Sequence, residues 1–170
     1  MTTADRFKLL SLTAGGLGLM KPASGTWGST PPPAIFAVMI LAGASLESVR
    51  VVMIVLLLLA TAACVAFTKW GEQRWGKKDA GQIVADEVAG MCLPLLIVPA
   101  VSEPTSGPGF LRLTIVLAVA FLLFRFFDIA KLQPANAAQK LPHGWGVLVD
   151  DLVAGLYATI ALAVGLRLLW

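Results

Sequence analysis

The sequence is short of charge and of the residue types on which many catalytic sites depend. Only 14% of its 170 residues are charged, against about 25% in a typical soluble domain, and 58% are hydrophobic. It contains one histidine and two cysteines. Together with a mean hydropathy of +0.83, this composition indicates an integral membrane protein. No polar stretch is long enough to fold separately, so residues 1–170 are expected to form a single domain.

The scarcity of histidine and cysteine excludes several kinds of site. Neither Cys64 nor Cys92 is followed by an arginine six residues later, so the phosphocysteine loop of tyrosine phosphatases is absent. The chain has no D-x-D-x-[TV] stretch for an aspartyl-phosphate, and a single His143 excludes a two-histidine mechanism. Both cysteines lie in apolar runs and are expected to be small buried hydrophobes.

Charge and the N-terminus narrow the classes further. The net charge of +3 is too small to suggest nucleic-acid binding, so the partner expected is the membrane itself. The short apolar run after Met1 leads into Gly16, Gly18, Lys21 and Pro22 rather than a small-residue cleavage site, so no removable signal peptide is expected.

Five apolar segments follow a polar N-terminal region. Residues 3–13 are amphipathic and predict a short interfacial helix, whereas residues 14–33, rich in Gly, Pro, Ser and Thr, predict an ordered or re-entrant loop. The apolar segments span 34–46, 51–67, 83–101, 110–127 and 147–169. The first is short for a span of about 20 residues. The expected fold class is therefore all-α, a polytopic membrane helical bundle with about five membrane segments.

The basic residues orient this bundle. If all five segments cross, ten of the thirteen lysines and arginines fall on the side of the N-terminus, which makes that side cytoplasmic and places the C-terminus outside. Four polar clusters fall on the same side, namely Gly25–Ser29, Asp86-Glu87, Arg125 to Lys131, and Asp150-Asp151. A re-entrant hairpin over 34–67 would keep them together as well. In either case we expect one site at the cytoplasmic face.

Two acidic pairs are the strongest candidates for chemistry. Asp86-Glu87 and Asp150-Asp151 are each followed by a glycine about one helical turn later, in the stretches DEVAG and DDLVAG. A carboxylate facing lipid costs about 2.5–3.5 kcal/mol, so both pairs must face protein, water or a cation. The glycines would let two helices approach closely, and facing carboxylates suit a hard divalent ion such as Mg²⁺. Close packing with ion pairs to Lys or Arg is the alternative.

Three further groups could bind an anion. Arg125, Asp128 and Lys131 are spaced to share a helical face, where they could hold phosphate or simply anchor the helix end. The stretch from Lys21 to Ser29 offers glycine amides and the hydroxyls of Thr26 and Ser29, but it could merely turn the chain. His143 is a candidate loop acid, base or phosphate contact.

In this order the motifs resemble the phosphatidylglycerophosphatase A family. The family pattern of a G-x-G…PGT-x-GS loop, IV-x-DE-x-x-G-M, FR-x-x-D-x-x-KP-x-P and HGG-x-G-x-x-x-DD-x-x-AG corresponds here to Gly16–Ser29, Ile83–Met91, Phe124–Lys131 and His143–Gly155. The chain departs from it at Ser24, Leu132 and Trp145. It also lacks the acidic residue usual before the histidine, because 135–142 read ANAAQKLP.

The resemblance implies Mg²⁺-dependent hydrolysis of phosphatidylglycerophosphate to phosphatidylglycerol and phosphate at the bacterial inner membrane. It implies that Asp86, Glu87, Asp150 and Asp151 hold the metal and, with Asp128, form the catalytic set. The resemblance also implies eight phosphate-binding positions, namely Arg125, Lys131, Lys21, Gly25, Thr26, Gly28, Ser29 and His143.

The sequence fits two other functions less well. A CDP-alcohol phosphotransferase would need the pattern D-x-x-D-G…G-x-x-x-D-x-x-x-D, yet Asp86 has no acid three or four residues later. A non-enzymatic ion transporter would carry charges near the middle of several spans, whereas 34–46, 51–67 and 110–124 contain only Arg112, near the start of its segment.

Overall fold

The regular elements of the chain are helices throughout the part that the structure, a computed structural model, describes: residues 1–78, 80–100, 104–132 and 144–169. In chain order they are α1 (Thr3–Leu12), the 3₁₀ helix η1 (Ala14–Leu19), α2 (Ser24–Gly28), α3 (Pro31–Leu41), α4 (Leu46–Trp75), α5 (Ala85–Leu95), α6 (Gly107–Ala130) and α8 (Gly144–Leu169). The expected all-helical class is confirmed.

Three of these helices are long and apolar enough to cross a membrane, namely α4, α6 and α8. The helices α3 and α5 have 11 residues each. At 1.5 Å per residue they are about 16 Å long, roughly half of a hydrocarbon core of about 30 Å. The chain is therefore a membrane protein with three candidate spanning helices, and the expected number of about five segments is not confirmed.

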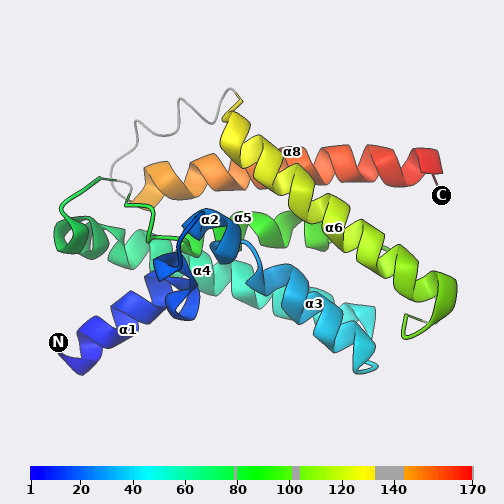
Figure 1. Ribbon diagram of the computed structural model, residues 1–170, viewed down its shortest axis with the longest axis horizontal. Helices are drawn as coiled ribbons and strands as arrows, with labels where there is room; N and C mark the ends of the chain where they lie inside the picture. The colour runs from blue at the N-terminus through cyan, green and yellow to red at the C-terminus, as the bar shows by residue number, and fades with distance from the viewer. Residues whose placement is uncertain (79, 101–103, 133–143, 170) are drawn as a thin grey trace.

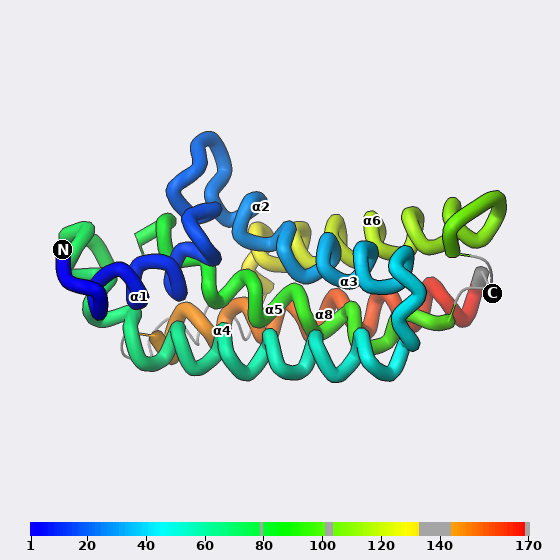
Figure 2. Tube along the Cα trace, turned by 90° about the horizontal axis from the view of Figure 1, so that it is seen from below, coloured from blue at the N-terminus to red at the C-terminus, as the bar shows by residue number. Residues whose placement is uncertain are grey.

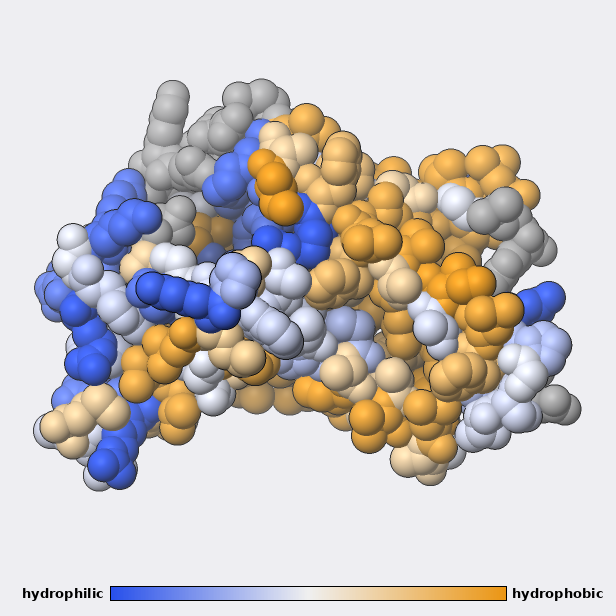
Figure 3. All heavy atoms as spheres, in the orientation of Figure 1, coloured by the Kyte–Doolittle hydropathy of each residue, from blue (hydrophilic) through white to orange (hydrophobic). Residues whose placement is uncertain are grey.

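The two shorter helices nevertheless run alongside the long ones (Figures 1 and 2). The N-terminus and the C-terminus lie at opposite ends of the long axis of the molecule (Figure 1). Hydrophilic residues gather at the end that carries α1, and hydrophobic residues cover most of the remaining length of the face shown in Figure 3. This distribution indicates that the long axis lies across the membrane.

Helix α5 occupies the centre of the bundle. Nine of its 11 residues are buried, and it packs against α2, α3, α4, α6 and α8. The main core cluster surrounds its second half and includes Phe36, Met91, Leu95, Phe124 and Ala158. Because α5 is enclosed by protein, acidic residues at its start are kept away from lipid without needing to reach bulk water.

The N-terminal region folds into short helices rather than the loop expected for residues 14–33. The helix α1 begins with a reciprocal cap, in which Thr2 and Asp5 each accept a backbone N–H of the other at 3.1 Å. The hydrogen bond from the Thr2 backbone holds the pKa of Asp5 below its usual value. Gly15 and Gly16 lie within η1 and adopt positive φ, which kinks the chain there, so no continuous helix forms, as the composition predicted. The turn carries α2 toward the start of α5.

Candidate active site

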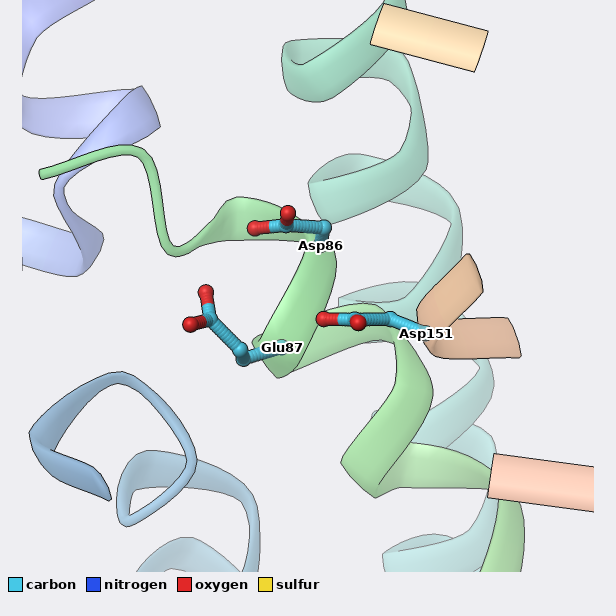
Figure 4. A group of neighbouring side chains, drawn as sticks. All are labelled: Asp86, Glu87 and Asp151. Atoms are coloured by element: carbon cyan, nitrogen blue, oxygen red, sulfur yellow. The ribbon is translucent and has the colours of Figure 1, made fainter. Parts of the chain in front are cut away.

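Three carboxylates come together where α5 and α8 meet. Asp86 and Glu87 lie in the first turn of α5, and Asp151 lies near the start of α8. One oxygen from each side chain lies within 4.8 Å of the others, and the three side chains extend toward the same region in Figure 4. Asp86 is only 3% exposed and Asp151 only 5% exposed. Ionised carboxylates buried at this density require a compensating positive charge.

Two glycines make this meeting possible. A Cβ added at Gly90 would lie 2.5 Å from the carbonyl oxygen of Asp151, and one added at Gly155 would lie 2.3 Å from the carbonyl oxygen of Gly90. The backbones of α5 and α8 are therefore in direct contact beside the acids. The close approach that DEVAG and DDLVAG predicted is confirmed.

Arg125 of α6 borders the acidic cluster. Its Nη1 lies 2.5 Å from Oδ2 of Asp128, one turn further along α6, and 3.5 Å from the hydroxyl oxygen of Ser29. A Cβ at Gly25 would lie 2.5 Å from Oε1 of Glu87 and 3.1 Å from the same Nη1. The backbone of α2 therefore packs against both the acid and the arginine. A larger residue at position 25 would separate these elements.

Lys131 and Asp150 form a second ion pair outside this cluster, with 2.9 Å between Nζ and Oδ2. Lys131 ends α6 with φ 45° and ψ 54°, a left-handed conformation. It therefore leaves the helical face that Arg125 and Asp128 share. The residues that the spacing grouped on one face thus belong to two ion pairs, and Asp150 is not part of the three-carboxylate group.

The backbone amides of the Gly25–Ser29 stretch were expected to be open to an anion, but those of Thr26, Trp27 and Ser29 are hydrogen-bonded locally. The amides of Thr26 and Trp27 donate to the carbonyl of Ala23, and the amide of Ser29 donates to that of Gly25. They are therefore engaged within α2 instead of forming an open cradle. Gly28 is buried, and its α-carbon packs against Val84 just before α5.

Two further candidates, Lys21 and His143, are not part of the described acidic cluster. Lys21 is exposed and lines a separate pocket of about 370 Å³ with Lys77 and Gln82. His143 lies outside the described residues.

Ser24 was not singled out as a site residue, yet its hydroxyl donates to the carbonyl of Gly81 and ties α2 to the segment before α5. Its place in the motif where the family has proline was the only hint. Cys64 and Cys92 are buried, as predicted.

The residues of the cluster fit a divalent cation. Oε2 of Glu87 and Oδ2 of Asp151 are buried and have no hydrogen-bond partner within the described part of the chain. An oxygen that has lost water and gained no donor is destabilised unless a cation approaches it. Three carboxylates supply the oxygen ligands that hard divalent ions prefer.

The fold and the site together define a class of protein: a helical membrane protein with a buried acidic cluster and an adjacent arginine near its polar end. Comparison with known proteins specifies the class further. The family model for phosphatidylglycerophosphatase A matches residues 10–166. The chain belongs to the phosphatidylglycerophosphatase A family, and its members are phosphoric monoester hydrolases.

Individual relatives agree with this assignment. The chain is 35% identical over 146 residues to the phosphatidylglycerophosphatase A of Haemophilus influenzae, an alignment that covers 85% of the chain and 80% of that protein. It is 37% identical over 93 residues to a putative phosphatidylinositol-3-phosphatase of Bacteroides thetaiotaomicron, covering 55% of the chain and 52% of that protein. No solved structure gives a significant match.

Proposed function

We propose that the protein hydrolyses phosphatidylglycerophosphate to phosphatidylglycerol and inorganic phosphate in a Mg²⁺-dependent reaction. We place this reaction at the cytoplasmic face of the bacterial inner membrane. Ten of the thirteen basic residues are expected on the side of the membrane that carries the N-terminus and the four polar clusters. The observation that carries the proposal is the convergence of Asp86, Glu87 and Asp151 beside Arg125, in a chain of this family.

The metal would be held by Asp86 and Glu87 from α5 and by Asp151 from α8. Buried oxygens of Glu87 and Asp151, which have no hydrogen-bond donor among the described residues, support this assignment. When bound, Mg²⁺ neutralises charge on the phosphoryl oxygens and lowers the pKa of a bound water. Enclosure of α5 by neighbouring helices limits the number of water molecules around the reacting group and strengthens each electrostatic interaction there.

Arg125 is the proposed phosphate ligand. Its guanidinium carries several N–H donors, so the contact with Asp128 and Ser29 through Nη1 leaves other donors for a phosphoryl oxygen. We assign Asp128 the role of orienting the guanidinium, because a carboxylate at 2.5 Å fixes the direction of its planar group. Stabilising charge on the equatorial oxygens is most of what phosphoryl transfer requires of a protein.

The ion pair of Lys131 and Asp150 is proposed to bind the rest of the headgroup. Nζ of Lys131 is partly exposed, with 38% of the side chain accessible, and can therefore meet a substrate arriving from the membrane surface. The α2 stretch contributes shape through Gly25 and Gly28, and Ser29 through its hydroxyl. Lys21, Thr26 and His143 remain proposed phosphate contacts.

Phosphate release from phosphatidylglycerophosphate by the purified full-length protein in detergent micelles tests this function. Turnover should stop in EDTA and return when Mg²⁺ is added in excess. The double variant Glu87→Gln/Asp151→Asn should stay inactive at every Mg²⁺ concentration. Activity that persists in EDTA would reject the metal-dependent reaction, and an inactive wild type with Mg²⁺ present would reject the substrate.

The second relative supplies a useful comparison substrate. Phosphatidylinositol 3-phosphate and phosphatidylglycerophosphate both carry a phosphomonoester on a lipid headgroup. In the first the headgroup is an inositol ring, which is bulkier than the glycerol of the second. Competition between the two lipids in one assay measures their relative kcat/KM. We expect phosphatidylglycerophosphate to be preferred, in line with the family match over residues 10–166.

A further inference from the structure

A pocket of about 590 Å³ opens between α1, α4 and α5, on another side of α5 from the acids. Its lining is almost entirely apolar and includes Phe7, Leu10, Ala63, Phe67, Ala85 and Val88. We call it the α1–α4 groove. Ala85 and Val88 are three residues apart on one face of α5, whereas Glu87 packs toward Gly25 and Arg125. The groove is therefore separate from the acidic cluster.

The groove is bordered by exposed hydrophobic side chains. Phe7 is 63% exposed, Leu10 is 53% exposed and Leu59 is 64% exposed. Small residues along α4, among them Ala62 and Ala66, line it as well. The volume lies within the range of about 300–1,000 Å³ that small-molecule sites occupy. In a membrane, the acyl chains of lipids surround the protein and can fill such a space.

Two cations lie at the polar end of the groove. Phe7 and Phe67 meet edge to face at 5.9 Å there. Lys8 follows Phe7, and its Nζ lies 5.8 Å from the centre of the Trp70 ring. The guanidinium carbon of Arg74 lies 5.6 Å from the same ring. Two cations near one aromatic ring, next to an apolar groove, match the order of a lipid's phosphate and acyl chain.

These cations are available to an anion. No salt bridge in the described part of the chain involves Lys8 or Arg74. Asp5, the acid nearest Lys8 on α1, accepts the Thr2 backbone N–H and attracts Lys8 electrostatically, but it forms no salt bridge with Lys8. Each Lys or Arg near an anionic headgroup contributes to binding, and aromatic rings favour the same interfacial depth.

We propose that the α1–α4 groove binds one anionic phospholipid of the surrounding membrane, with an acyl chain between α1 and α4 and its phosphate at Lys8 and Arg74. Bound there, the lipid fastens α1 to the bundle by filling the space between them. This site is independent of the hydrolytic reaction, because it shares no side chain with the acidic cluster.

Native mass spectrometry of the purified full-length protein can count lipids that survive detergent removal. Dioleoyl phosphatidylserine and dioleoyl phosphatidylcholine are suitable probes, because they share acyl chains, differ in net charge and carry no phosphomonoester. We expect one phosphatidylserine to be retained in preference to phosphatidylcholine. Lys8→Gln and Arg74→Gln should each weaken that retention about fivefold.

Matched controls separate the site from diffuse charge attraction. Arg6→Gln and Lys69→Gln remove one charge each from the same two helices but from side chains not stacked on Trp70, so retention should stay at the wild-type level. Ala66→Leu narrows the groove without changing charge and should also reduce retention. Ala118→Leu on α6, an exposed position outside the groove, should not.

Three results would overturn the proposal. Equal retention of the two lipids would remove the headgroup preference, and equal losses in all four charge variants would show that the attraction is diffuse. A dimer that forms in place of the lipid complex, and dissociates in Ala66→Leu, would assign the groove to a second copy of the chain.

Discussion

The adjacent aspartates Asp150 and Asp151 have different surroundings and should have different functions. Asp151 belongs to the three-carboxylate group, while Asp150 pairs with Lys131 at 2.9 Å. We predict that Asp151→Asn lowers kcat by at least about 100-fold, because a bound metal supplies several kcal/mol of transition-state stabilisation. Asp150→Asn should instead raise KM and leave the Mg²⁺ concentration for half-maximal activity near that of the wild type. Steady-state kinetics at varied Mg²⁺ and substrate measure both effects.

A third variant tests the pairing itself. Lys131→Gln should raise KM as Asp150→Asn does, and the double variant should add little further, because the two side chains act as one unit. Asp5→Asn, in the cap of α1, is a control for carboxylate loss away from the site. If Asp150→Asn shifted the Mg²⁺ requirement as strongly as Asp151→Asn, then all four acids would share the metal, as the two acidic pairs suggested.

Arg125 permits a prediction about geometry rather than charge. In Arg125→Lys the positive charge remains, but the planar fork that contacts Asp128 and Ser29 is lost. Losing one charge-assisted hydrogen bond costs about 1.5–3 kcal/mol, so kcat/KM should fall about tenfold or more. The Mg²⁺ dependence should not change. Wild-type kcat/KM in this variant would remove Arg125 from the phosphate site.

Contact between α5 and α8 can be tested with two glycines of the same helix. In Gly155→Ala the new Cβ would lie 2.3 Å from the carbonyl oxygen of Gly90, so the backbones must separate. Overpacking of this kind costs about 1–3 kcal/mol and should lower Tm by several degrees. Activity should fall as well, because the acids on the two helices move apart.

Gly165 provides the control for that prediction. A Cβ added there meets no atom of the described residues within 4 Å, and alanine favours a helix over glycine by up to about 1 kcal/mol. Thermal unfolding in detergent should therefore show Gly165→Ala at or above the wild-type Tm. If both variants unfolded at the same temperature, α5 and α8 would not be in backbone contact at Gly155.

The sequence predicted which helices meet, but not how each side chain is directed. DEVAG and DDLVAG share one pattern, and it correctly predicted the approach of Gly90 to α8. It could not separate Asp150 from Asp151, since neighbours on a helix diverge by about 100° and only packing decides which one faces α5. The left-handed conformation of Lys131 was equally hidden, because a non-glycine residue with positive φ leaves no clear mark in the sequence.

The whole bundle shows the same division between pattern and packing. Hydropathy located α4, α6 and α8. Helix α4 continues past the expected end at residue 67 to Trp75, where Gly76 caps it in a left-handed conformation and donates its N–H to the carbonyl of Glu72. Hydropathy also placed apolar segments at α3 and α5. It could not predict that these helices would be 11 residues long, since an apolar stretch can be buried by protein as well as by lipid.

The orientation of the bundle can be tested on the intact chain. In Figure 1, α4 and α6 run toward the end that carries the N-terminus, while α3, α5 and α8 run away from it, so the two chain ends lie at opposite ends of the molecule. Because ten of the thirteen basic residues fall on the N-terminal side, we predict a cytoplasmic N-terminus and a C-terminus outside.

A reporter that is active only in the cytoplasm should work when fused before Met1 and fail after Trp170. Replacing Lys77 and Lys78 with glutamine removes two charges without touching the acidic cluster, and should weaken this preference. Strong activity of the C-terminal fusion in the unmodified chain would place the acids on the opposite face, out of reach of a cytoplasmic substrate pool.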